Sequence, residues 1–182
     1  YIGQLVAKKL TGFDSNVVVY DPYVDDDTLN EHNVKRAELE ELFEISDFIS
    51  VHARLTEENK GIINADLFSK MKPTAYFINT GRAGLVDQAA LVQVLKDGKI
   101  MGAALDVFTT EPIPADSPYL ELDNVTLTTH IAGTTSDALN NSPYLLAADI
   151  AELFNGKKPK FIINPEVLDQ PAFSEWLASV RG

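Results

Sequence analysis

The sequence of 182 residues contains no cysteine, so disulfides, thiolate nucleophiles and cysteine-ligated metals are excluded. No apolar run approaches the roughly 20 residues that a membrane-spanning helix needs. Basic residues are few, since 15 lysines and arginines stand against 27 aspartates and glutamates, for a net charge of −12. Such a charge repels phosphate backbones, so no nucleic-acid partner is expected. With no membrane segment and no apparent signal peptide, we expect a cytoplasmic protein.

The residues that are present suit a globular domain, because 45% of them are hydrophobic. Short β-branched segments predict strands, and amphipathic segments between them predict helices. Strands that alternate with helices favour an α/β fold with a doubly wound parallel sheet, covered on both faces. The strands are expected at residues 17–20, 47–51, 75–79, 100–106 and 125–128. The helices are expected at residues 2–10, 35–43, 66–71, 88–97 and 139–154, with Asp87 as an N-cap and with Gly98 and Gly156 as helix ends.

Two residues near the start suggest a dinucleotide site. Gly3 precedes a predicted helix, and Asp21 ends the next predicted strand 18 residues later. In a Rossmann-type fold, the third glycine of the G-x-G-x-x-G loop lets helix and strand pack closely, and an acidic residue about 20 positions on binds the ribose hydroxyls. Taken singly, Gly3 is more often a packing glycine and Asp21 an N-cap. If Asp21 binds ribose, its charge repels a 2′-phosphate and favours NAD over NADP.

The same comparison predicts that part of the fold lies outside this chain. The first strand and the start of the glycine-rich loop would come just before Tyr1. In such a sheet the first strand lies in the middle, so its absence would leave a gap with two unpaired edges. We therefore expect an N-terminally truncated chain that belongs to a longer protein.

Three histidines are candidates for proton transfer near neutral pH. His52 and His130 each follow a predicted strand, at the end where ligands bind in open α/β sheets. His32 lies in a polar stretch and is interpreted as a surface residue. Taken alone, each histidine is more often structural than catalytic.

Two charged residues complete the set of catalytic candidates. Arg82 lies in a glycine-flanked loop after a strand, where its two N–H groups can hold a carboxylate. Glu111 stands before a proline, and a carboxylate beside a histidine would fix the tautomer of the ring and stabilise its protonated form. The simpler interpretations are a surface arginine and a loop acid.

Together these segments resemble the D-isomer-specific 2-hydroxyacid dehydrogenase family, which includes phosphoglycerate dehydrogenase, from residue 1 to about residue 165. So many motifs in order are far more specific than one glycine loop. The matching segments are YIG at residues 1–3, VYDP at 19–22, VHARLT at 51–56, MKP at 71–73, NTGRAGLVD at 79–87, ALDVF at 104–108, EP at 111–112 and NVTLTTHIAG at 124–133.

The resemblance implies an NAD-dependent enzyme that interconverts a 2-keto acid and a D-2-hydroxy acid. In it His130 would be the proton donor, Glu111 its partner and Arg82 the ligand of the substrate carboxylate. Asp106 would contact the nicotinamide end of NAD. The residues implied to bind NAD are Tyr1, Ile2, Gly3, Asp21, His52, Thr56, Thr80, Gly81, Asp106, Ala132 and Gly133. No metal site is expected.

The resemblance also implies an organisation and leaves an alternative open. Residues 1–158 would form the NAD-binding domain, and residues 159–182 would return to a substrate-binding lobe that is otherwise absent. A homodimer acting on a small 2-keto or 2-hydroxy acid is expected. The alternative is an NAD(H)-sensing regulatory or corepressor-like protein on the same fold, and an inactive fragment is a third possibility.

Overall fold

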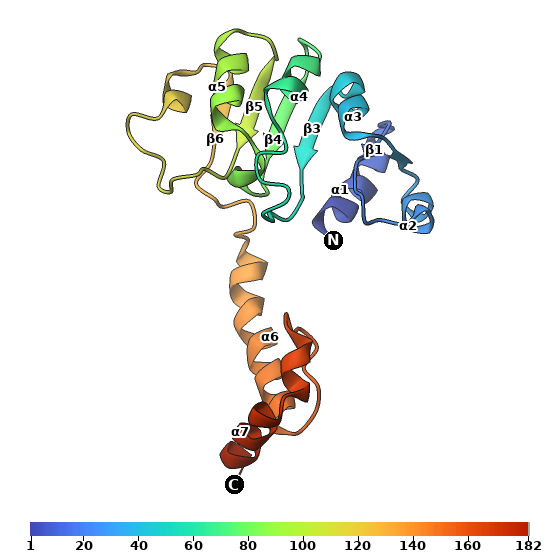
Figure 1. Cartoon of the computed structure of the whole chain (residues 1–182), viewed down its shortest axis with the longest axis vertical. Helices are drawn as coiled ribbons and strands as arrows, with labels where there is room; N and C mark the ends of the chain where they lie inside the picture. The colour runs from blue at the N-terminus through green and yellow to red at the C-terminus, as the bar shows by residue number, and fades with distance from the viewer. Residues whose placement is uncertain (182) are drawn as a thin grey trace. The chain divides into compact units, whose positions relative to one another are not determined.

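The computed structural model describes residues 1–181, which fall into two compact units, Tyr1–Ala132 and Gly133–Gly182 (Figure 1). The first unit is an α/β domain with two parallel sheets. Its strands are β1 (Val18–Val19), β2 (Lys35–Arg36), β3 (Phe48–Val51), β4 (Tyr76–Asn79), β5 (Gly102–Leu105) and β6 (Val125–Leu127). Its α-helices are α1 (Ile2–Leu10), α2 (Asp26–Glu31), α3 (Leu39–Ile45), α4 (Ala65–Lys70) and α5 (Gln88–Lys96), with short 3₁₀ turns at Thr11–Phe13, Ala83–Leu85 and Pro118–Glu121.

The larger sheet has the order β3-β4-β5-β6, and all its strands run parallel. The smaller sheet is the parallel pair β1-β2. Among the described residues, β1 and β3 therefore each have one hydrogen-bonded neighbour. The predicted Rossmann-type α/β class with a parallel sheet is confirmed.

One face of the larger sheet carries the main core. Figure 1 shows α4 and α5 in front of the strands, and buried side chains of α3, α4 and α5 pack on this face. Phe68 meets Phe43 and Phe77 edge to face, with ring centroids 6.3 and 5.2 Å apart. Such contacts add to the apolar area that the helices bury. The strand loops are therefore anchored to a rigid base.

The opposite face of this sheet differs from the prediction of burial on both sides. Side chains alternate between exposed and buried along β3, and Phe48 and Tyr76 stack with centroids 5.5 Å apart while 67% and 41% exposed. Alternation is what a sheet covered on one face produces. Within the first unit, Phe48 and Tyr76 therefore remain exposed on this face.

The segment between β1 and β3 also differs from the prediction. The sequence predicts one helix at residues 35–43, whereas the structure has β2 at Lys35–Arg36 and α3 at Leu39–Ile45. This strand was missed because it is only two residues long and both residues, Lys35 and Arg36, are charged and exposed. Helix α2 was not predicted either, although Asp25 caps it by accepting a hydrogen bond from the Thr28 N–H at 2.7 Å.

The other predicted helices are confirmed to within a few residues. Asp87 caps α5 by accepting from the Ala90 N–H at 3.1 Å, and Gly98 follows α5 with a φ of +61°. That left-handed φ suits glycine, which has no Cβ to clash.

The second unit is helical. Its elements are α6 (Ser136–Phe154), a 3₁₀ turn (Pro165–Asp169) and α7 (Pro171–Arg181). Trp176 on α7 lies within ring contact of Phe154 and Phe173. No residue of α6 is buried, and by its contacts α6 belongs to this unit, while the predicted domain boundary at residue 158 stays a prediction. Among the described helices, none has the length and apolarity to span a membrane.

Candidate active site

The functional candidates gather at one edge of the first unit. Asp21 follows β1, His52 follows β3, Thr80 follows β4 and Asp106 follows β5. His130 follows β6 two residues further on. Parallel strands place their carboxyl ends at a common edge, which is where open α/β sheets bind ligands. The fold thus brings five residues that lie far apart in the sequence to the same edge of this unit.

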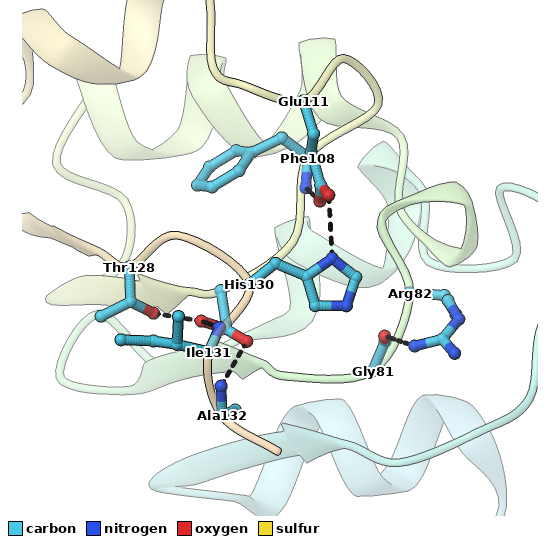
Figure 2. A network of polar contacts seen from close by, with 9 residues as sticks. Gly81, Arg82, Phe108, Glu111, Thr128, His130, Ile131 and Ala132 are labelled. Atoms are coloured by element: carbon cyan, nitrogen blue, oxygen red, sulfur yellow. Dashed lines mark hydrogen bonds and ion pairs between the residues drawn. The ribbon is translucent and has the colours of Figure 1, made fainter. Parts of the chain in front are cut away.

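His130 and Glu111 form a direct pair. The Nδ1 atom of His130 lies 2.8 Å from Oε2 of Glu111, and the other carboxylate oxygen accepts from the Phe108 N–H at 3.0 Å (Figure 2). An ionised carboxylate only accepts, so the hydrogen of this pair lies on Nδ1. The His130 hydrogen bond, followed by that of Phe108, lowers the pKa of Glu111 and keeps it ionised. The remaining ring nitrogen, Nε2, is thereby left for the substrate.

Arg82 lies across the same cleft. Its Nη1 donates to the Gly81 carbonyl at 2.8 Å, and Figure 2 shows the guanidinium on the Nε2 side of the His130 ring. A cleft of about 410 Å³ is lined by Arg82, Glu111 and His130 together with Leu55 and Phe108, among others. A cation, a proton-transfer group and apolar walls in one cleft suit a small organic acid.

The Arg82 loop is shaped by Asn79, which is 2% exposed. The Asn79 side chain accepts from the Gly81 N–H at 2.9 Å and donates to the Arg82 carbonyl at 3.2 Å. A Cβ on Gly81 would lie 3.1 Å from the Val51 carbonyl oxygen, so this close approach to the end of β3 favours glycine. Asn79 was not among the predicted site residues. Its place at a strand end, where asparagine often bonds nearby backbone, is the signal that points to it.

Asp106 holds the loop that carries His130. Its Oδ1 accepts from the Thr128 hydroxyl at 2.5 Å and the Ile131 N–H at 2.9 Å, and its Oδ2 accepts from the Ala132 N–H at 2.9 Å. Burial by itself raises the pKa of Asp106, but these hydrogen bonds outweigh it, so the net pKa is lowered. His130 has a φ of +59°, a left-handed conformation that persists only when neighbours fix it.

Asp106 therefore has a structural task beside its predicted contact with nicotinamide, which stays a prediction. Thr128 was not predicted as a site residue. No sequence pattern distinguishes it from the other threonines of residues 126–129, and only the fold brings it to Asp106.

The nucleotide side of the edge begins at the N-terminus of α1. A Cβ on Gly3 would lie 3.5 Å from Cβ of His52, so α1 and the loop after β3 meet here. The Nε2 atom of His52 is 2.9 Å from the Ser50 hydroxyl, and burial lowers the pKa of His52. The lowered pKa favours the neutral form of the His52 ring.

Asp21 stands where the ribose ligand is predicted. One carboxylate oxygen accepts from the Tyr23 N–H at 2.9 Å, which bends the chain away from β1. The side chain is exposed at the carboxyl edge. These residues fit the adenosine end of NAD.

The remaining predicted ligands of NAD are placed less closely. Tyr1 and Ile2 are 93% and 64% exposed at the start of α1, where first-turn amides have no partner within the helix. Thr56 is exposed, and its N–H donates to the Asn59 side chain. Thr80 is exposed at the end of β4, whereas Gly133 belongs to the second unit. Among residues 1–181, no three His, Asp or Glu side chains gather as metal ligands would.

The fold and the site together define a dinucleotide-binding domain whose loops carry an acid–base pair and an arginine. Residues 1–132 match the family described as "D-isomer specific 2-hydroxyacid dehydrogenase, NAD binding domain", and the chain belongs to this family. The predicted family and cofactor class are confirmed.

Relatives agree with this assignment. The chain is 42% identical to a glyoxylate reductase of Thermofilum pendens, over 92% of the chain and 50% of the relative. It is 39% identical to a D-3-phosphoglycerate dehydrogenase of Archaeoglobus fulgidus, over 90% of the chain and 31% of the relative. Among solved structures, a D-lactate dehydrogenase with NAD⁺ from Lactobacillus jensenii superposes with a TM-score of 0.81 at 28% identity, over 89% of the chain and 52% of that structure. The chain spans half or less of the length of these curated relatives.

Proposed function

We propose that this chain is the NAD-binding part of an enzyme that interconverts a 2-keto acid and a D-2-hydroxy acid. The observation that carries the proposal is the 2.8 Å pair of His130 and Glu111 in a cleft shared with Arg82. A purely structural histidine would not need an ionised partner on one nitrogen and an open cleft at the other.

The proton is handled by His130. In reduction, protonated His130 donates from Nε2 to the keto oxygen, and in oxidation neutral Nε2 removes the hydroxyl proton. Glu111 keeps the hydrogen on Nδ1 and stabilises the imidazolium. Bound NADH supplies the hydride that C2 of the keto acid receives. The sum is one hydride and one proton added across the carbonyl.

Arg82 supports both binding and charge. Its planar guanidinium can hold the substrate carboxylate with two N–H groups, which fixes the keto carbon relative to His130. A positive charge beside the carbonyl also stabilises the negative charge that develops on its oxygen. The residues that would hold the cofactor are Tyr1, Ile2 and Gly3 at the pyrophosphate, Asp21 at the ribose, and His52, Thr56, Thr80, Gly81, Asp106, Ala132 and Gly133 along the cleft.

The test is turnover by the full-length protein. Oxidation of NADH is followed with a panel of 2-keto acids, and the product is resolved by chiral chromatography. We expect at least one 2-keto acid to be reduced, with the D enantiomer as product. Tight NADH binding without reduction of any member would favour the alternative, an NAD(H)-sensing protein. An L product would contradict the assigned family chemistry.

Three further predictions concern the whole protein. We expect a homodimer, which light scattering on the purified full-length protein would show as twice the monomer mass. We expect the protein in the cytoplasm, which fractionation of the producing cells tests. The return of residues 159–182 to a substrate-binding lobe is checked by a structure of the full-length protein.

A further inference from the structure

The loop between β1 and α2 is closed by a single guanidinium. Arg36 on β2 sends Nη1 to the Asp21 carbonyl at 2.9 Å and Nη2 to the Val24 carbonyl at 2.7 Å. Its Nη2 also forms an ion pair with Asp26 Oδ1 at 2.9 Å. One side chain therefore joins β2 to both ends of the segment that follows β1.

This arginine lies next to the predicted ribose ligand. Arg36 is the register partner of Val19, two residues before Asp21, and its guanidinium bonds the backbone of Asp21 itself. Its side chain is 38% exposed, so solvent and ligands can reach it. Arginine is the side chain that matches a phosphate with two parallel N–H bonds.

This inference rests on the proposed function. We propose that Arg36 would bind the 2′-phosphate of NADP if its guanidinium were not already occupied by Asp26 and by the carbonyls of the loop. The preference for NAD then depends on two elements. The Asp21 carboxylate repels a 2′-phosphate, and the Asp26 carboxylate holds the guanidinium that bonds the Asp21 carbonyl.

The arrangement makes a specific prediction about cofactor switching. Removing the Asp21 carboxylate alone relieves repulsion but supplies no new ligand, because Arg36 stays paired with Asp26. Removing both carboxylates frees one N–H of Arg36 Nη2 for phosphate, while its hydrogen bonds to the two loop carbonyls remain. Arg36 is thus a residue for cofactor specificity, and its effect on NADPH affinity appears only when Asp26 is replaced.

Asp27 offers a matched control. It is adjacent to Asp26, lies in the same first turn of α2 and is exposed, but it makes no hydrogen bond or ion pair with Arg36. Replacing either residue by alanine changes the net charge equally and removes one acid from the same helix end. A difference between the two variants therefore reports on release of Arg36 and not on charge.

The experiment measures equilibrium Kd values for NADH and NADPH by nicotinamide fluorescence with full-length protein. The variants are Asp21→Ser, Asp21→Ser/Asp26→Ala, Asp21→Ser/Asp27→Ala, and Asp21→Ser/Asp26→Ala/Arg36→Ala. We expect Asp21→Ser/Asp26→Ala to bind NADPH about tenfold more tightly than the Asp27 control. Adding Arg36→Ala should abolish this gain, while Arg36→Lys should keep only part of it.

Several results would overturn the inference. Equal NADPH affinity in the Asp26 and Asp27 variants would do so, as would a gain that survives Arg36→Ala while NADH still binds. A parent that binds both cofactors equally or neither of them would also contradict it. Because the readout is binding, loss of keto-acid turnover with this selectivity pattern intact would count against the proposed function alone.

Discussion

The two sheets of the α/β unit hold their functional loops in different ways. The loops after β4, β5 and β6 rest on a core in which Phe68 and Phe77 are fully buried. Hydrogen bonds of two buried side chains, Asn79 and Asp106, fix the conformations of these loops. The loop after β1 rests on a small cluster of Ala7, Leu29 and Val34 and is closed by an exposed arginine.

This difference separates the loops that hold the proton donor from the loop that recognises the cofactor. The catalytic loops depend on buried carboxylate and amide groups whose hydrogen bonds leave little freedom, which suits a proton donor that must be placed accurately. The nucleotide loop depends on exposed charges that are easily exchanged. Changes at Asp106 should therefore disturb the rate, whereas changes around Arg36 should alter which cofactor binds.

Apart from loss of His130 itself, the largest effect in this comparison is expected at the arginine of the catalytic loops. Arg82→Ala should lower kcat/KM for the keto acid by about 10²–10³-fold, because the carboxylate loses its two-point contact and the oxygen its nearby charge. Arg82→Lys should fall between parent and alanine, since the charge remains without the planar fork. Exposed Arg54 does not line the cleft, so Arg54→Ala is the control. Steady-state kinetics decide, and an equal loss in both alanine variants would contradict the role of Arg82.

The next effect concerns the support of His130. Asp106→Asn places an amide against backbone N–H groups of residues 131–132, which should cost about 1–3 kcal/mol of stability. We expect kcat to fall about tenfold as the loop loses its fixed conformation, with a smaller change in the Kd for NADH. Exposed Asp97, whose carboxylate bonds Gln93, provides Asp97→Asn as the control. A weakened NADH Kd with unchanged kcat would instead support direct contact of Asp106 with nicotinamide.

One part of the pH dependence is expected to come from Glu111. The pKa of Glu111 lies below its ordinary value of 4.5. Above pH 4.5 the ionised carboxylate therefore stabilises the folded state through its pair with His130. This contribution is lost as the pH falls through the lowered pKa. We expect Glu111→Gln to lower kcat and to remove the acid limb due to this carboxylate from the pH–rate profile. An unchanged acid limb in Glu111→Gln would assign it to another group.

The smallest effects are expected at two helix caps, one in each region. Asp87→Ala removes the cap of α5 over the main core and should lower the stability of the domain by about 1 kcal/mol, seen as a lower Tm. Asp25→Ala removes the cap of α2 and should speed amide exchange locally, within α2 and the loop after β1. Exchange that also rises at residues 128–132 in Asp25→Ala would mean that the two regions are coupled.

Much of the fold could be predicted because the strands of the larger sheet are apolar and the helices have clear ends. Asp87 and Gly98 mark α5 at both ends, and the structure agrees. The two-residue strand β2 could not be predicted, because its pairing with β1 depends on tertiary position and its charged residues look helical. The open face at Phe48 and Tyr76 escaped prediction because apolar composition does not show which side is covered.

The site shows the same limit. Motif order singled out Arg82, Glu111 and His130, and the structure brings them into one cleft. The residues that support them, Asn79 and Thr128, act through distances that only the fold creates. A carboxylate such as Asp106 can be named from a motif, but its three hydrogen bonds to the His130 loop cannot.

In the proposed enzyme His130 delivers the proton, while the residues at the strand ends and at the start of α1 bind NAD. The most direct test compares the parent, His130→Ala and the control His32→Ala, at a histidine that does not line the cleft, in full-length protein. NADH binding is measured by titration and the single-turnover rate of NADH oxidation by stopped flow. We predict unchanged NADH affinity in all three and a rate about 10²–10⁴-fold lower in His130→Ala alone. A single-turnover rate in His130→Ala equal to that of the parent would contradict the account.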